Sequence, residues 1–325
     1  MLLYLSFLFL KFIIYTGNII FLNIVNSNFL AIVVPLHKYN FFEETLSSIF
    51  SQTDLSFNLY IGNDGNKNDE NIKKFINENK GDIAVKYVNF DENLGSSSLT
   101  KQWERCIELS NDEEWIWLFS DDDFMDKNCV KKFKEILQKR SNVHIFKYNS
   151  CKIHNGIITQ KNILKPNIDL ELFVYLKLNN KIESYMSDVI FSRKLYIINN
   201  KFQNYPLAWC SDDFFIIKSL LDHKMEIIPD AAIYWRYSSI NISGKENDYI
   251  SNKKKITACL LFLNDLKNIK IFKILGKRYL MYSKRWFFNQ LKYKKRTLSI
   301  YEQIYYVTKY YIIYITIYID LHKRK

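Results

Sequence analysis

Short apolar runs alternate with amphipathic segments between residues 29 and 119. Residues 29–34 are continuously apolar and end at Pro35, which is typical of a strand buried on both faces of a sheet. Apolar side chains then recur at helical spacing over 41–50, with two glutamates near the start. The pattern repeats and predicts strands over 59–61, 84–88 and 115–119 and helices over 71–79 and 99–109. This order predicts an α/β domain with a largely parallel sheet and helices on both faces.

Pro35, Asp64 and the acidic run 121–123 each follow a predicted strand at its carboxyl end. These ends meet along one edge of a parallel sheet, which is where such folds bind ligands. Three adjacent carboxylates repel one another unless a cation is present, and their oxygens suit Mg²⁺ or Mn²⁺. The alternative is an acidic loop before a helix over 127–140. In either case we assign Asp126 to the N-cap of that helix.

Positive charge is concentrated near the C-terminus. The 325-residue chain has a formal net charge of +12, and residues 245–325 contain 19 Lys and Arg but only 5 Asp and Glu. Trp286, Phe287 and Tyr293 alternate with these basic residues. The apolar run 310–319 is shorter than the roughly 20 residues that a membrane-spanning helix needs. We expect a helical extension lying on an anionic membrane surface, without nucleic acid binding. The alternative is a helical subdomain whose aromatic residues pack in its own core and whose basic face is solvated.

Residues 1–28 are strongly apolar, with Lys11 inside the run. Two interpretations stay open for this segment. It is either a short membrane anchor or an N-terminal extension translated from an upstream start codon. The predicted organisation is therefore an N-terminal segment 1–28, an α/β domain 29–245 and a basic, aromatic helical tail 246–325.

Composition and missing motifs exclude several classes of protein. A content of 48% hydrophobic and 25% charged residues is that of a globular chain, not a disordered one. Five scattered cysteines without a C-x-x-C pair indicate reduced thiols in a cytoplasmic protein, not a disulfide framework or a zinc site. The chain also has no G-x-S-x-G motif, and no G-x-G-x-x-G follows its first strand, which disfavours hydrolase and nicotinamide chemistry.

Several ordered motifs resemble glycosyltransferase family 2. The motifs that carry the resemblance are residues 31–40, 44–53, 62–65, 93–95, 119–123, 189–193, 202–213 and 234–243. The resemblance covers roughly residues 29–245. It implies the GT-A fold, with a Rossmann-like sheet, and the transfer of a sugar from a nucleotide donor with inversion at the anomeric carbon.

The resemblance also implies roles for individual residues. The nucleotide sugar would contact Pro35, Asn40, Asp64, Asp121, Asp122 and Arg236. Asp123 and Asp121 would hold the metal, and Asp212 would be the catalytic base, with Asp213 as the alternative. Asp64 is otherwise an ordinary turn residue, and Arg236 otherwise forms a surface salt bridge. The chain departs from the family pattern at Ser211, where Glu is frequent, and at Ser238, where many relatives carry His.

The sequence therefore predicts an inverting glycosyltransferase that uses a nucleotide-diphosphate sugar, with a UDP-sugar expected, and Mg²⁺ or Mn²⁺. The expected acceptor is a lipid-linked glycan at the cytoplasmic face of the membrane, in capsule or O-antigen synthesis. A nucleotidyltransferase is one alternative, but residues 35–40 lack the glycines of a phosphate loop. A catalytically inactive protein that binds nucleotide sugars is the other.

Overall fold

The computed structural model describes residues 29–65, 69–140 and 142–323. A nine-stranded sheet lies at its centre, with strand order β3-β2-β1-β4-β8-β6-β9-β5 and β7 paired to β6. The strands are β1 (Leu30–Leu36), β2 (Asn58–Asn63), β3 (Val85–Asn89), β4 (Trp115–Leu118), β5 (Phe124–Met125), β6 (Ile145–His154), β7 (Ile157–Asn162), β8 (Val189–Ser192) and β9 (Met225–Tyr237). Of two short 3₁₀ turns, η1 (Met186–Asp188) contacts the sheet, and η2 (Pro206–Ala208) contacts α3 (Leu99–Ile107) and α8 (Tyr249–Asn268). The N-terminal segment 1–28, predicted as an anchor or an extension, lies outside the described residues.

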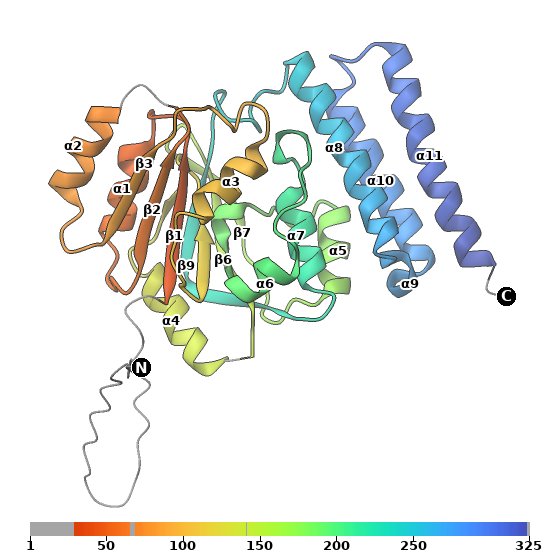
Figure 1. Cartoon of the computed structure of the whole chain (residues 1–325). Coiled ribbons are helices and arrows are strands. Elements are labelled where there is room, and N and C mark those ends of the chain that lie inside the picture. Colours follow the sequence, from red (N-terminus) through yellow and green to blue (C-terminus); the bar gives the residue numbers. More distant parts are fainter. Residues whose placement is uncertain (1–28, 66–68, 141, 324–325) are drawn as a thin grey trace, which may run out of the picture.

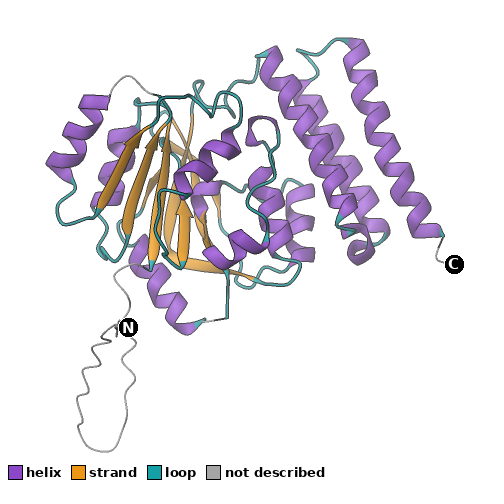
Figure 2. Ribbon diagram, viewed as in Figure 1, coloured by secondary structure: helices purple, strands orange, loops and turns teal. Residues whose placement is uncertain are grey.

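Helices cover both faces of the sheet (Figures 1 and 2). They are α1 (Phe42–Phe50), α2 (Asp69–Asn79), α3 (Leu99–Ile107), α4 (Cys129–Lys139), α5 (Leu170–Leu178), α6 (Arg193–Ile198), α7 (Ser211–Ser219), α8 (Tyr249–Asn268), α9 (Ile271–Leu275), α10 (Lys277–Lys294) and α11 (Ile300–His322). Successive side chains of β1 enter opposite cores. Ile32 and Val34 join the cluster beneath α1, α2 and α4, whereas Ala31 and Val33 join the cluster beneath α3 and α5–α8.

The predicted α/β sheet is confirmed. Strands β1 to β4 pair in parallel, and their order agrees with the strands predicted between residues 29 and 119. Antiparallel pairing begins where β8 joins β4 and continues at β6–β8, β6–β7 and β5–β9. The mostly parallel part therefore brings the ends of β1, β2 and β4 to one edge.

Asp126 does not cap α4, so that prediction is wrong. The helix begins at Cys129, and Asn128 occupies its N-cap position. The Asp126 carboxylate instead accepts hydrogen bonds from the Ala232 backbone N–H at 2.8 Å and from the Tyr234 hydroxyl at 3.1 Å. These partners on β9 lie more than 100 positions away in the sequence, so the local spacing around Asp126 gives no indication of them.

The C-terminal extension is a group of helices that shares a core with the α/β domain. The predicted boundary at 245/246 falls in the loop between β9 and α8, and α8, α9, α10 and α11 contribute side chains to the same apolar cluster as α5 and α7. Trp286 and Phe287 are buried in that cluster, which is the alternative considered for these aromatic residues. Among the described residues, no helix combines the length and the apolar character needed to cross a bilayer.

Candidate active site

A cavity of about 1180 Å³ opens at the carboxyl ends of β1, β2 and β4. It brings together most of the residues predicted from the sequence. The predicted residues that line it are Pro35, Asp64, Asp121, Asp122, Asp123, Asp212 and Asp213. Asn40, which is exposed, and Arg236 are not among the described residues that line this cavity.

Asp64 is buried and holds a neighbouring loop. Its carboxylate accepts hydrogen bonds from the backbone N–H groups of Leu94 and Gly95, at 2.8 and 2.9 Å. The guanidinium of Arg105 lies 2.8 Å from the same carboxylate. A Cβ atom on Gly95 would lie 2.6 Å from an Asp64 oxygen, so this approach requires glycine. Asp64 therefore fixes the loop that contains Gly95 at the edge of the cavity.

The acidic run after β4 is bound by backbone amides and a serine. Asp121 accepts hydrogen bonds from the backbone N–H groups of His37 and Lys38, at 2.7 and 2.8 Å. Asp123 is buried and accepts one hydrogen bond from the Ser187 hydroxyl at 2.6 Å and another from the Arg236 backbone N–H at 2.9 Å. These bonds connect the end of β4 to the β1 loop, to η1 and to β9.

Burial raises the pKa of all three carboxyl groups in this run, and repulsion from neighbouring carboxylates adds to the effect at Asp122 and Asp123. The pKa of Asp122 rises to about 6 through burial and the neighbouring Asp121. The pKa of Asp123 rises well above its ordinary value through burial and the neighbouring Asp122. Crowded carboxylates of this kind are stabilised in their charged form by a nearby cation.

The donor atoms fit a divalent ion bound together with a diphosphate. Among the described residues, no three His, Cys, Asp or Glu side chains form a metal-binding group. Mg²⁺, however, usually takes only one or two carboxylates and completes its shell with water and substrate phosphates. A carboxylate offers about four lone-pair positions, and Asp121 and Asp123 each use two of them for the hydrogen bonds described above.

Arg236 forms a salt bridge, and its side chain is not part of the cavity lining. Its guanidinium pairs with Glu44 and lies 4.2 Å from the centroid of the Phe41 ring. Its Nε donates to the backbone carbonyl of Asp122 at 2.9 Å. Side chains alternate along β9, and its neighbours Trp235 and Tyr237 line the cavity instead. The side chain of Arg236 thus fastens the acidic loop to α1.

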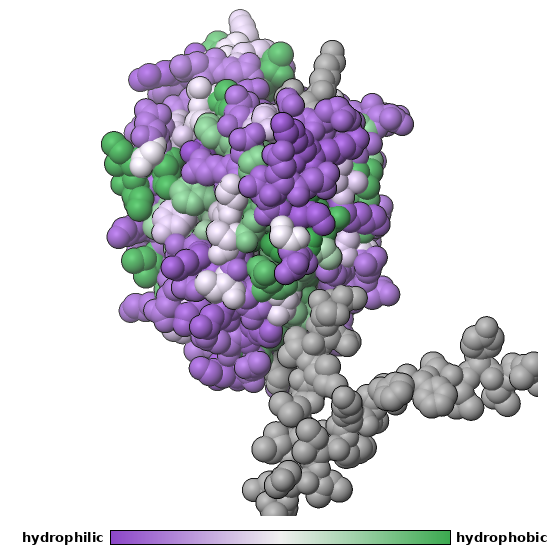
Figure 3. Space-filling model, turned by 90° about the vertical axis from the view of Figure 1, so that its left-hand side faces the viewer, coloured by the Kyte–Doolittle hydropathy of each residue, from purple (hydrophilic) through white to green (hydrophobic). Residues whose placement is uncertain are grey.

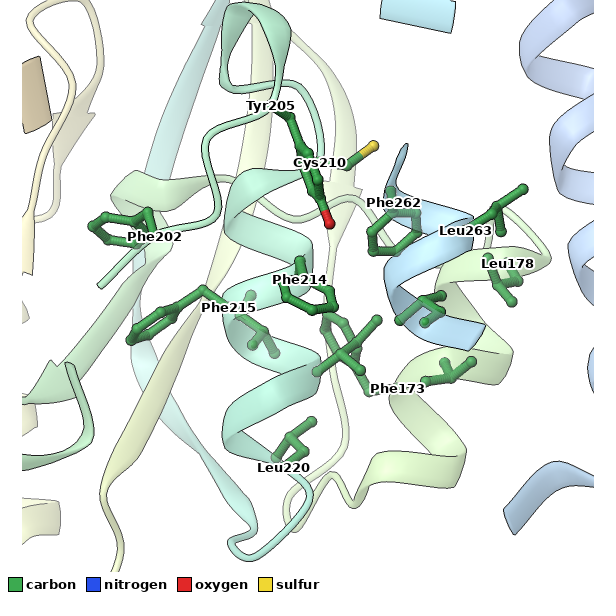
Figure 4. Packing of buried hydrophobic residues seen from close by; sticks show 14 of the residues in the cluster. Phe173, Leu178, Phe202, Tyr205, Cys210, Phe214, Phe215, Leu220, Phe262 and Leu263 are labelled. Atoms are coloured by element: carbon green, nitrogen blue, oxygen red, sulfur yellow. The ribbon is translucent and has the colours of Figure 1, made fainter. Parts of the chain in front are cut away.

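Helix α7 carries the second acidic group of the cavity. Asp212 and Asp213 lie in its first turn, where the helix dipole favours negative charge. Apolar side chains hold the helix in place, and Figure 4 shows Phe214 and Phe215 pointing to opposite sides of it. Phe214 lies in the same cluster as Phe262 of α8, with ring centroids 6.5 Å apart. The helical extension therefore helps to position α7.

The two aspartates differ in their partners. Asp213 is buried and forms an ion pair with Lys177 of α5 at 2.6 Å. Asp212 is half-buried, and its carboxylate accepts a hydrogen bond from the Asp213 backbone N–H at 2.9 Å. Burial and the adjacent Asp213 raise the pKa of Asp212 to about 7. Although burial lowers the pKa of Lys177, Asp213 and Asp212 raise it overall, so the lysine is cationic. Asp212 is therefore the carboxylate poised to exchange a proton near neutral pH.

Aromatic and polar side chains from distant segments complete the cavity. Tyr185 and Trp235 stack with ring centroids 4.4 Å apart, beside Ser187. Trp286 and Tyr293 of α10 also line the cavity. The C-terminal extension thus contributes directly to the cavity that contains Asp212.

Sequence reasoning missed Ser187 and Lys177. Ser187 lies on a short turn, and Lys177 lies on a helix whose other residues are mostly apolar. A lysine within an apolar helix that packs in the core was the one available signal, because buried lysines are rare unless they are paired. No sequence motif around Ser187 or Lys177 indicates that they contact Asp123 and Asp213.

The family model of glycosyl transferase family 2 matches residues 31–226, more than half of the chain. The chain therefore belongs to this family, and its fold is that of the GT-A glycosyltransferases. No curated protein matches the sequence.

Solved structures of TarS from S. aureus are similar to this chain in fold. TarS 1–349 in complex with UDP-GlcNAc has a TM-score of 0.58 and 15% sequence identity, and the match covers 74% of this chain and 66% of that one. TarS 1–349 without a named ligand has a TM-score of 0.60 and 14% identity, covering 84% of this chain and 76% of that one. At such low identity the likeness shows the fold.

Proposed function

We propose that this protein transfers a sugar from a nucleotide-diphosphate donor, a UDP-sugar, to a hydroxyl group of a lipid-linked glycan. The observation that carries the proposal is that one cavity contains both Asp64 with the acidic run 121–123 and, from a different element, Asp212. The first group lies at the strand ends where α/β folds bind nucleotides. The second supplies a carboxylate for the acceptor. The UDP-GlcNAc bound by the similar TarS structure supports the choice of donor.

Asp212 is the proposed catalytic base. Inverting transfer needs a group that removes the acceptor hydroxyl proton while the oxygen attacks the anomeric carbon and the diphosphate leaves. A carboxylate whose pKa is about 7 accepts this proton more readily than an ordinary aspartate does. Asp213 is committed to Lys177, so its proposed role is to hold that cation beneath the base.

Asp121 and Asp123 are the residues that would hold Mg²⁺ or Mn²⁺. When bound, the ion would neutralise the charge that develops on the departing diphosphate. Asp121 also orders the backbone of His37 and Lys38, and Ser187 and the Arg236 backbone orient Asp123. These hydrogen bonds fix the orientation of the Asp121 and Asp123 carboxylates before substrate binds.

The acceptor side supports a glycan substrate. Stacked aromatic rings such as Tyr185 and Trp235 offer apolar faces to sugar rings, and polar groups such as Gln290 line the same cavity. The basic extension supports work at the cytoplasmic face of the plasma membrane, where lipid-linked glycans for capsule or O-antigen are assembled. The protein would then associate with the membrane peripherally.

A donor screen tests this proposal. Purified protein is incubated with UDP-, GDP- and dTDP-sugars, with or without Mn²⁺ and with extracted lipid-linked acceptors, and nucleotide release is measured. We expect Mn²⁺-dependent release from a UDP-sugar, and its loss in the Asp123→Ala variant with the fold intact. Donor binding without any release would support the inactive binding protein instead, and pyrophosphate release from a nucleoside triphosphate would support a nucleotidyltransferase.

A further inference from the structure

Helix α11 lies at the edge of the molecule and leaves one face uncovered (Figure 1). Six large apolar side chains on this face are between 42% and 81% exposed. This apolar stripe consists of Tyr301, Ile304, Tyr305, Ile312, Ile315 and Ile319. Tyr301, Tyr305, Ile312, Ile315 and Ile319 follow one another at gaps of four, seven, three and four residues, and Ile304 lies three residues after Tyr301, so all six lie on the same side of the helix.

The opposite side of α11 accounts for the packing of the helix. Tyr306, Tyr310 and Ile317 are buried, and Tyr310 stacks on Phe287 of α10 with ring centroids 4.6 Å apart. A capping box between Ser299 and Glu302 fixes the start of the helix. Because the inner side already anchors α11, the apolar stripe is not needed for the fold.

Lysines border the apolar stripe on both sides. Lys309 is exposed, and its Nζ lies 5.5 Å from the ring centroid of Tyr305. On the other side, the Nζ of Lys284 in α10 lies 6.0 Å from the ring of Tyr311. The acidic residue nearest the start of the helix, Glu302, is neutralised by Lys253 at 3.0 Å. The other acidic residue of α11, Asp320, lines a hollow together with Lys267, Lys270 and Lys323. The stripe is thus an apolar surface bordered mainly by lysines.

The far side of the molecule differs in character. Figure 3 shows this side, which carries α2 in Figure 1, as mostly hydrophilic with scattered apolar groups. The end formed by α11 therefore differs from this side, because exposed apolar side chains follow one another along a single helix there. Such surfaces mark sites of interaction.

We propose that the apolar stripe of α11 is the surface that docks on an anionic lipid bilayer, with the helix lying in the plane of the headgroups. Isoleucines would enter the acyl boundary, tyrosines would lie at headgroup level, and Lys284 and Lys309 would contact lipid phosphates. A second copy of the chain fits less well, because its helical tail would carry the same excess of 19 basic over 5 acidic residues and would be repelled. This inference deepens the proposed membrane role and names the face that performs it.

Vesicle flotation of the full chain tests the docking surface without requiring sugar transfer. Vesicles contain phosphatidylcholine with or without about 30% phosphatidylglycerol, and the test variant is Ile312→Glu with Ile315→Glu. The matched control is Ile157→Glu with Ile163→Glu, two exposed isoleucines at β7 on the α/β domain. We expect about a tenfold or greater loss of binding to anionic vesicles in the test variant and none in the control. Equal binding by both variants would overturn the proposal.

A second measurement excludes a contribution from the rest of the chain. An environment-sensitive fluorophore is attached at Ile312→Cys, and in a separate protein at Ile157→Cys, both in a Cys151→Ser background because the other four native thiols are buried. Anionic vesicles should shift emission to the blue at position 312 alone. A shift caused by protein concentration without vesicles would identify a second copy as the occupant and overturn the proposal. Either failure would leave donor turnover unaffected, so it could be distinguished from failure of the proposed function.

Discussion

Asp212 and Asp213 are adjacent in sequence, yet their surroundings separate their roles. The ion pair with Lys177 binds Asp213 in place, while Asp212 faces the cavity with a pKa of about 7. The sequence placed both residues at the start of a helix, and the structure confirms that position. The sequence could not separate their roles, because Lys177 precedes Asp213 by 36 positions and approaches both aspartates only in the folded chain.

The Lys177→Met variant tests this separation. The cation lowers the pKa of Asp212, so its removal should raise that pKa. A base must be deprotonated to act, and the acid limb of the kcat/KM profile should therefore move from near pH 7 upward by about one unit.

Adding Asp213→Asn to that variant provides the control. It removes a negative charge that raises the pKa of Asp212, so the limb should return toward its wild-type position. If the acid limb of the kcat/KM profile does not shift in Lys177→Met, Lys177 does not control the pKa of Asp212.

Gly95→Ala tests the loop held by Asp64. The added Cβ would approach an Asp64 oxygen to 2.6 Å, and overpacking of this kind costs about 1–3 kcal/mol. We expect a several-fold rise in the donor KM with a smaller change in kcat. Asp91→Ala, at an exposed position of the same loop, should change neither value. Equal donor affinity in both variants would show that this loop does not contact the donor.

At the scale of elements, short turns and single strands position the acidic run. Turn η1 carries Ser187, which bonds Asp123, and Asp188, which pairs with Lys147 of β6 in the core. The sequence predicted β1, β2 and β4 well, because their apolar runs are continuous, and it also predicted β3, although Lys86 interrupts the apolar residues of that strand. The strands beyond β4 pair in both directions, antiparallel at β4–β8 and β6–β8 and parallel at β6–β9, and this long-range pairing is not encoded by apolar periodicity. The same limit explains why Ser187 was missed and Asp126 was assigned to the wrong partner.

Lys147→Met tests the buried ion pair beneath η1. Both side chains are fully buried, so removing the lysine leaves an uncompensated carboxylate. Broken buried pairs cost about 3–5 kcal/mol, which should appear in the free energy of unfolding measured with urea. The Lys147→Met/Asp188→Leu variant should recover most of that loss, since apolar replacement of a whole pair is often neutral. Equal losses in the single and the double variant would contradict a charge-based explanation.

At the scale of the whole molecule, the helical extension is part of the enzyme's core. Buried side chains of α8 and α10, including Phe262, Trp286 and Phe287, join the cluster that supports α7. The extension also lines the cavity through Tyr293 and the ring of Trp286. The charge of the tail predicts a surface role, and in the structure the tail also packs in the core of the α/β domain.

A fragment that ends at residue 245 should consequently fail to fold. Each large apolar side chain buried by the extension contributes about 1.5–3 kcal/mol, and the loss of several exceeds a typical stability of about 5–15 kcal/mol. Near-ultraviolet circular dichroism of the fragment should lack the fixed aromatic signal of the full chain. A cooperative urea transition in the fragment would indicate that residues 29–245 form an independent domain.

The most direct test of the whole account is the rate of nucleotide release with donor and extracted acceptor, compared among the wild type, Asp212→Asn and Asp213→Asn. We predict that Asp212→Asn lowers kcat by about 10²–10⁴-fold, while calorimetry finds donor affinity nearly unchanged. Asp213→Asn should retain more activity, because the base itself remains. Wild-type turnover by Asp212→Asn would contradict the assignment of the base and, with it, the proposed mechanism.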